Sequence, residues 1–284
     1  MTSEADALPV LRVRVLQLAY DDDETVAERV RRVADLVARQ RDADLIVLPE
    51  LWAPGYFTFP RWAERAETLD GPTVTAMAEA ARSANAVVHL GSILERADAG
   101  AAATGAAVPA GGRGLWNTSV VLGADGSRIA AYRKIHPFGF GEGEPTLIDA
   151  GTDLVAVAVD RAEASAVVGL ATCYDLRFPE LFRQLTAVGA TVFTVPAAWP
   201  AARREHWQVL GRARAIENQA FVVQCNTGGT HGGVTLDGHS QIISPQGVVL
   251  AQAGAGEQVL AVDLDLHGLD EYRRAFPVLA DRRL

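Results

Sequence analysis

The segment Ala43-Asp-Leu-Ile-Val-Leu-Pro-Glu-Leu-Trp52 joins a continuous apolar run, Leu45–Leu48, to a carboxylate, Glu50. A short apolar run of this kind is typical of a strand that is buried on both faces. A similar segment, Ala190-Thr-Val-Phe-Thr-Val-Pro-Ala-Ala-Trp199, occurs in the second half of the chain. There Ala197 stands where the first copy has Glu50, so we expect the two halves to share a fold but to differ in function.

The likeness between the halves extends beyond this pair. Two more pairs follow in the same order. Val87–His89 matches Val222–Gln224, and the hairpin around Gly126 matches the hairpin around Gly247, with Ser119 opposite Ser240 in the alignment. Chance explains any one pair as well as duplication does, but three pairs in order favour duplication. Two facing halves of this kind predict a layered α/β sandwich with a pseudo-twofold axis.

Strand and helix patterns alternate along most of the chain. The expected strands are Val10–Leu18, Leu45–Leu48, Ala86–Leu90, Trp116–Leu122, Ser127–Lys134, Ala166–Thr172, Thr191–Val195, Phe221–Gln224, Gln241–Ser244 and Val248–Ala251. Helical spacing of apolar residues predicts helices over Thr25–Arg39, around Val74–Ala81, from Phe178 to Leu185 and over Arg203–Gln219. The Ala/Gly/Pro-rich segment 99–114 is expected to be an exposed loop rather than a linker, because strand patterns resume on both sides. We therefore expect one domain over 1–284, with a core of about 10–277.

Composition and charge exclude several classes of protein. Hydrophobic residues make up 49% of the 284, enough for a large core, and the net charge of −9 lacks the basic clusters of a nucleic-acid binder. Only two cysteines occur, so a disulfide framework is not expected. The acidic N-terminus is unlike a signal peptide, and no apolar run reaches the ~18 residues of a membrane span. These features predict a cytoplasmic protein.

Three reactive side chains follow predicted strands, at the strand ends where α/β proteins build their sites. Glu50 is suited to act as a base there, although a loop acid or a helix cap looks the same in sequence. Lys134, in Tyr132-Arg-Lys-Ile-His-Pro137, taken alone resembles an ordinary charge at a sheet edge. Cys173 lies at a strand-to-helix turn before Pro179, where a helix dipole would favour the thiolate; an inert buried cysteine is the alternative.

Other nucleophiles and bases are weaker candidates. Cys225 lies within a predicted strand with no flanking acid or base, so we expect it to be structural. His89, His136 and His206 fall in no protease-like signature. Neither zinc-ligand spacing nor a nucleotide-binding or nucleophile-elbow motif occurs, so no metal ion or cofactor is expected.

Taken together, these segments resemble the Glu, Lys and Cys motifs of the nitrilase (carbon–nitrogen hydrolase) superfamily, in the same order. The matching segments are Leu48-Pro-Glu-Leu-Trp52, Tyr132-Arg-Lys-Ile-His136 and Cys173-Tyr-Asp-Leu-Arg-Phe-Pro-Glu180, supported by Trp116-Asn-Thr-Ser-Val120, Pro196-Ala-Ala-Trp-Pro200 and Arg212-Ala-Arg-Ala-Ile-Glu-Asn-Gln219. The likeness runs from about Val10 to Pro277.

The resemblance implies a four-layer αββα sandwich and a homodimer or larger homo-oligomer. It also implies Cys173 as nucleophile, Glu50 as general acid and base, and Lys134 as the cation that stabilises the oxyanion. Relatives carry a second glutamate between Lys and Cys. Glu142 and Glu144 both qualify, and we favour Glu144 because the residues after it resemble the stretch that follows this glutamate in relatives.

The residues after the nucleophile point to the substrate. Tyr174-Asp175 resembles the amidase branches, and the run to Glu180 resembles ω-amidases and deaminated-glutathione amidases, which act on amides that also carry a carboxylate. We predict Tyr174, Arg177 and Trp199 as substrate-binding residues, with Arg177 either clamping a carboxylate or forming an ion pair with Asp175 or Glu180. The expected activity is release of ammonia from a small carboxamide. An N-carbamoyl-amine hydrolase and an inactive interaction scaffold are the alternatives, and a nitrile hydrolase is disfavoured.

Overall fold

The computed structural model describes residues 10–97, 111–140, 142–161 and 164–283, in which two six-stranded sheets form the centre of the molecule. The first sheet has the order β14-β1-β2-β3-β4-β5, with β1 Val10–Gln17, β2 Leu45–Val47, β3 Val87–Arg96, β4 Leu115–Leu122, β5 Arg128–Arg133 and β14 Gln258–Asp265. The second has the order β13-β12-β9-β8-β7-β6, with β6 Ala156–Arg161, β7 Ala164–Leu170, β8 Val192–Ala197, β9 Phe221–Asn226, β12 Gln241–Ile243 and β13 Val249–Gln252. A separate hairpin joins β10 Gly228–His231 to β11 Val234–Asp237.

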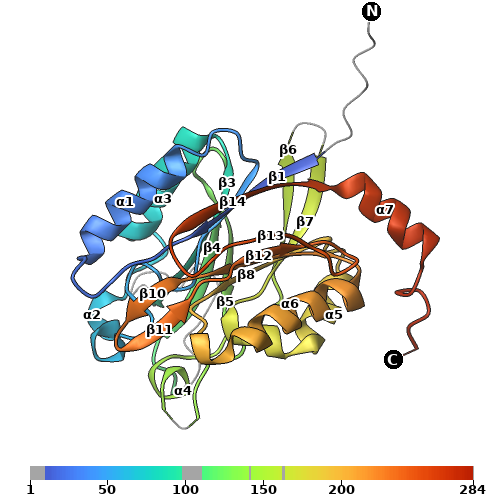
Figure 1. The fold of residues 1–284 in the computed structure, drawn as a ribbon. Helices are drawn as coiled ribbons and strands as arrows, with labels where there is room; N and C mark the ends of the chain where they lie inside the picture. Colours follow the sequence, from blue (N-terminus) through green and yellow to red (C-terminus); the bar gives the residue numbers. More distant parts are fainter. Residues whose placement is uncertain (1–9, 98–110, 141, 162–163, 284) are drawn as a thin grey trace, which may run out of the picture.

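Helices cover the outer faces of the two sheets (Figure 1). The α-helices are α1 Val26–Ala38, α2 Trp62–Arg65, α3 Pro72–Ala84, α4 Glu144–Leu147, α5 Pro179–Ala187, α6 Arg204–Asn218 and α7 Leu266–Ala275. The 3₁₀-helices are η1 Phe59–Arg61, η2 Cys173–Arg177 and η3 Ala201–Arg203. Of the described helices, none is both long and apolar enough to cross a membrane.

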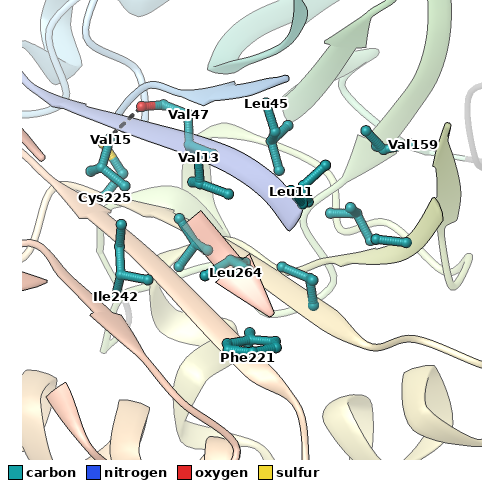
Figure 2. Packing of buried hydrophobic residues seen from close by; sticks show 14 of the residues in the cluster. Leu11, Val13, Val15, Leu45, Val47, Val159, Phe221, Cys225, Ile242 and Leu264 are labelled. Carbon is teal, nitrogen blue, oxygen red and sulfur yellow. Dashed lines mark hydrogen bonds between the residues drawn. The ribbon is translucent and has the colours of Figure 1, made fainter. Parts of the chain in front are cut away.

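Three packed interfaces produce the four layers. Figure 2 shows the central one, where Leu11 and Val13 of β1 meet residues of the second sheet such as Phe221 and Ile242. A second apolar cluster packs α1 and α3 on the first sheet, and a third packs α5 and α6 on the second. The result is the expected αββα sandwich.

The first helix illustrates how local sequence sets these layers. Thr25 accepts a hydrogen bond from the backbone N–H of Glu28, whose side chain accepts one from Thr25 in return, a capping box that fixes where α1 begins. Val33 and Val37, one turn apart, are buried against the first sheet. The helix predicted over Thr25–Arg39 is therefore confirmed.

The strand order reproduces the predicted repeat. Both sheets run from an outer strand (β14 or β6) through a β-α-β-α-β unit to a terminal hairpin (β4–β5 or β12–β13). The registers correct one detail of the alignment. Ile46 pairs with Val88 and Phe193 pairs with Val222, so Val88, rather than Val87, corresponds to Val222.

Some elements were not predicted. β14 pairs along the whole of β1, yet only Leu260 and Leu264 of its eight residues are buried, so its apolar pattern is faint. The β10–β11 hairpin is rich in glycine, which hides its strands in the sequence. Of the loop predicted over 99–114, the part up to 110 lies outside the described residues.

Candidate active site

The ends of strands from both sheets bring the predicted catalytic residues together. Glu50 follows β2 and Lys134 follows β5 of the first sheet, while Cys173 opens η2 after β7 of the second. Glu144 is the first residue of α4. Cys173 has a φ of 48° and Leu51, directly after Glu50, a φ of 44°. Backbone of this left-handed kind is strained for such residues and concentrates at functional sites.

Lys134 lies at the centre of this group. Its Nζ donates to Glu50 Oε1 and to Glu144 Oε2, each at 2.8 Å, and all three side chains are fully buried. Burial alone would lower the pKa of Lys134, but the charges of Glu144 and Glu50 outweigh it and raise this pKa. Lys134 is therefore a fixed cation.

The two carboxylates are held apart by fixed donors. Asn117 Nδ2 donates to Glu50 Oε1 and to Glu144 Oε1, both at 2.8 Å, and the backbone N–H of Ala198 donates to Glu50 Oε2 at 3.0 Å. Burial raises the pKa of Glu144, as does the nearby charge of Glu50, while Lys134 opposes both. In the sequence, Asn117 stands out only as part of the segment Trp116–Val120, which gives it no role of its own.

Cys173 is 6% exposed, and its surroundings favour the protonated thiol. Burial and the charge of Glu50 raise the pKa of Cys173 well above its ordinary value, against the smaller opposing effect of Lys134. The expectation that a helix dipole favours the thiolate is wrong. Cys173 opens a 3₁₀ turn of five residues, and the α-helix begins only at Pro179. A neighbouring base must therefore remove the proton.

A buried aspartate ties the Cys173 turn to the strand that carries Lys134. Asp175 accepts hydrogen bonds from Tyr132 Oη (2.7 Å), from His136 Nδ1 (2.7 Å) and from the backbone N–H groups of His136 (3.1 Å) and Thr172 (2.8 Å). The His136 ring also stacks on Phe178, with centroids 3.7 Å apart. Tyr132 and His136 flank Lys134 in sequence, so Asp175 fixes Lys134 relative to the nucleophile.

A small cavity opens onto Cys173. It is lined by the predicted substrate-binding residues Tyr174, Arg177 and Trp199 and, among others, by three residues that the sequence did not reveal: Tyr56, Phe138 and Arg203. Its volume is about 20 Å³. That is room for about one water molecule, so side chains at the mouth would have to move to admit a larger ligand.

Tyr56 is the unexpected polar group of this cavity. Its hydroxyl is buried and has no hydrogen-bond partner among the described residues. Its ring lies 5.7 Å from Lys134 Nζ. Burial and the charges of Glu144 and Glu50 raise the pKa of Tyr56 well above its ordinary value, so the hydroxyl stays protonated. Its motif, Pro54-Gly-Tyr56, gave no sign of this in the sequence.

Arg177 is half-buried and contacts aromatic rings. Its guanidinium carbon lies 4.8 Å from the centre of the Trp199 ring and 5.9 Å from that of Tyr174, and Nη2 lies 3.3 Å from His206 Nδ1. Neither Asp175 nor Glu180 forms an ion pair with it in the described part of the chain. Of the two interpretations of Arg177, the structural ion pair is therefore not observed.

The other candidate nucleophiles, bases and acids from the sequence lie outside the lining of the Cys173 cavity. Cys225 is in the central core, where its thiol contacts the carbonyl oxygen of Val47 at 3.4 Å (Figure 2). His89 is buried against Thr194, and Glu142 is exposed to solvent. A groove of about 660 Å³ elsewhere on the surface is lined by charges of both signs and includes none of the predicted catalytic residues.

Comparisons with known proteins identify the family and the fold. The carbon–nitrogen hydrolase family profile matches residues 12–274. A 2-oxoglutaramate amidase from Paenarthrobacter nicotinovorans is 46% identical over 96% of this chain and 90% of its own length, and one from Bacillus subtilis is 32% identical over 90% and 92%. The crystal structure of a carbon–nitrogen hydrolase superfamily protein from Xanthomonas campestris superposes with a TM-score of 0.84 at 27% identity, covering 98% of each chain.

Proposed function

Because the chain belongs to the carbon–nitrogen hydrolase (nitrilase) superfamily and is an amidase that acts on bonds other than peptide bonds, we propose that it releases ammonia from the ω-amide of a 2-oxo acid, 2-oxoglutaramate. The observation that carries the proposal is a single cavity whose lining contains both a nucleophile and an arginine. Cys173 and Arg177 both line this cavity, and Glu50 and Lys134, behind the lining, lie close enough to Cys173 to act on its thiol. Similarity to two 2-oxoglutaramate amidases supports the choice of substrate.

The first half of the reaction forms a thioester. Glu50 takes the proton from the Cys173 thiol as sulfur attacks the amide carbon, and the new oxyanion is stabilised by the Lys134 ammonium. Glu50 then gives this proton to the leaving nitrogen. The carbon–nitrogen bond breaks, ammonia leaves and the acyl group remains on sulfur.

The second half hydrolyses the thioester. Glu50, a carboxylate again, takes a proton from water as the water oxygen attacks the thioester carbon. The carbon–sulfur bond breaks and the sulfur regains the proton from Glu50, which restores the thiol. Glu144 and Asn117 keep Glu50 and Lys134 in place throughout. Glu144 accepts a hydrogen bond from Lys134, and Asn117 donates to both Glu50 and Glu144.

Ammonia release from a panel of compounds of matched length tests the proposal. The panel contains 2-oxoglutaramate, a neutral carboxamide, an N-carbamoyl amine and a nitrile. We expect the largest kcat/KM for 2-oxoglutaramate, complete loss with Cys173→Ala, and retained activity with the matched control Cys225→Ala. A preference for the N-carbamoyl amine or the nitrile would replace the proposed substrate class. Absence of turnover on every compound would support an inactive scaffold.

We propose a single domain, a homodimer or larger homo-oligomer, and a location in the cytoplasm. Both cysteines are free, which suits a reducing compartment. Light scattering of the purified protein would measure the oligomeric state.

A further inference from the structure

Two arginines share the wall of the Cys173 cavity. Arg177 ends η2 and Arg203 ends η3, and both side chains are half-buried. Each lies near aromatic rings: Arg177 near Trp199, and Arg203 with its guanidinium carbon 5.6 Å from the centre of the Phe138 ring. The Trp199 indole N–H donates to the Arg203 carbonyl at 2.8 Å, which fixes the backbone between them.

No acid neutralises this pair. Within the described residues, neither arginine forms an ion pair with a carboxylate, although the chain carries 35 acidic residues against 26 basic ones. Burial lowers the pKa of Arg177, and the positive charge of Arg203 lowers it further. Two like charges that repel one another beside a half-buried cavity are unfavourable unless a ligand supplies the missing negative charge.

The local backbone adds to the positive character of this wall. α6 begins at Arg204, directly after Arg203, and no side chain caps its N-terminus. The positive end of a 15-residue helix therefore lies beside the arginine pair. Arg204 itself differs, because it is exposed and forms an ion pair with Asp237 outside the cavity lining.

We propose that Arg177 and Arg203 together form the subsite for the carboxylate end of the substrate, and that Arg203 sets the preference for a carboxylate-bearing amide over a neutral one. This inference rests on the proposed function, which places the amide end of the same molecule at Cys173. Guanidinium groups bind planar carboxylates through paired hydrogen bonds. The carboxylate and the adjacent 2-oxo group of a 2-oxo acid offer three acceptor oxygens for two such groups.

The ratio of kcat/KM for 2-oxoglutaramate to kcat/KM for a neutral amide measures how much this subsite contributes to substrate preference. We expect Arg203→Met to lower kcat/KM for 2-oxoglutaramate about 10–100-fold, mainly through KM, since a hydrogen bond to a charged group contributes about 1.5–3 kcal/mol. The same variant should change kcat/KM for a neutral amide of equal length less than about 3-fold. Arg204→Met, the matched control, should leave both values unchanged.

Binding to the inactive Cys173→Ala enzyme separates this inference from the proposed function. Calorimetry with 2-oxoglutarate should show binding that Arg203→Met weakens at least about tenfold. If the wild type hydrolyses 2-oxoglutaramate while Arg203→Met keeps full selectivity and affinity, the subsite is wrong and the proposed function stands. If 2-oxoglutaramate is not hydrolysed but Arg203-dependent binding of 2-oxoglutarate persists, the subsite stands and the proposed reaction is wrong. Equal affinity for 2-oxoglutarate in Cys173→Ala and in Cys173→Ala/Arg203→Met overturns the inference, whatever the activity of the wild type.

Discussion

At the scale of single residues, the ammonium group of Lys134 has the most constrained position in the site. It is fully buried and lies 2.8 Å from a carboxylate oxygen on each of two sides, Glu50 and Glu144. An uncompensated charge at this depth would cost several kcal/mol, so the three groups are stable only together. A change in the shape of the cation should therefore disturb both carboxylates.

Lys134→Arg tests whether the shape of this cation matters. A planar guanidinium cannot place one nitrogen between both carboxylates, so kcat/KM should fall more than tenfold, a loss above ~1.4 kcal/mol. Arg133→Lys is the matched control, because Arg133 pairs with Glu95 away from the cavity. Steady-state kinetics on both variants decide the matter: an active Lys134→Arg enzyme would contradict the role of a positioned point charge.

Cys173 and Cys225 should differ in reactivity toward iodoacetamide. Both have a raised pKa through burial, so alkylation of either should accelerate as pH rises toward and beyond 9. Cys173 lines the small cavity, whereas Cys225 is fully buried in the central core, so Cys173 should be labelled first and activity should fall in proportion. Peptide mass spectrometry at several pH values provides the measurement. Inactivation that follows labelling of Cys225 would reassign the nucleophile.

At the scale of elements, Asp175 joins two segments that carry the chemistry. η2, which begins with Cys173, follows β7 of the second sheet, whereas β5, which leads into Lys134, belongs to the first sheet. Four hydrogen bonds to one buried carboxylate make this junction rigid. We regard Asp175 as a positioning residue because it acts through Tyr132 and His136 rather than on a substrate.

Asp175→Asn should separate positioning from simple stability. The amide keeps the size of the carboxylate but accepts fewer hydrogen bonds, and its NH₂ group would face donors. We expect kcat to fall at least tenfold with little change in KM, and a lower melting temperature as well. Asp160→Asn, an exposed carboxylate on β6, is the control. Full kcat in a destabilised Asp175→Asn enzyme would show that Asp175 is only structural.

Elements also show what the sequence can and cannot predict. Glu50, Lys134 and Cys173 could be selected because each stands at the end of a predicted strand and lies in a segment that resembles a motif of the family; taken alone, Lys134 resembles an ordinary charge at a sheet edge. Tyr56 and Arg203 could not, because they lie in a loop and in η3, where no periodic pattern places a side chain. Their proximity to Cys173 depends on how the two sheets face one another, which is a property of the tertiary structure.

At the scale of the whole molecule, the two sheets are joined by a polar contact as well as by apolar packing. His89 of β3 is fully buried, and its Nδ1 lies 3.0 Å from Thr194 Oγ1 of β8. Burial lowers the pKa of His89 to about 3. The folded protein therefore keeps this ring neutral at a pH where the unfolded chain protonates it.

This histidine should make the free energy of unfolding depend on pH. Below pH ~6.5 His89 is protonated in the unfolded chain, whereas in the folded protein it stays neutral until pH falls to about 3. The free energy of unfolding therefore decreases across this window as pH falls. One proton corresponds to at most ~1.4 kcal/mol per pH unit. Urea unfolding of the wild type and of His89→Gln at fixed protein concentration, from pH 7 to 4, should show a shallower slope for the variant. Parallel slopes would contradict the buried neutral ring.

The repeat made the overall architecture predictable from sequence. Matching segments around Glu50 and Ala197 identified equivalent strands in the two halves, and the sheets have the corresponding order. The one-residue error at Val87 arose because consecutive valines align equally well in either register. β14 could not be predicted because its pairing with β1 joins the two ends of the chain, a long-range contact that leaves little local pattern.

In the proposed mechanism, Cys173 carries a thioester whose formation and hydrolysis both use Glu50. Intact-protein mass spectrometry of Glu50→Gln, mixed with an activated ester that acylates Cys173 without a strong base, tests it most directly. Gln keeps the size of Glu but cannot take a proton, so the second step should slow ~10²–10⁴-fold. Glu50→Gln should accumulate a species heavier than the free enzyme by the acyl group, and Glu50→Gln/Cys173→Ala should not. A thioester that turns over at the wild-type rate in Glu50→Gln would show that Glu50 does not activate water and would make Glu144 the base to examine.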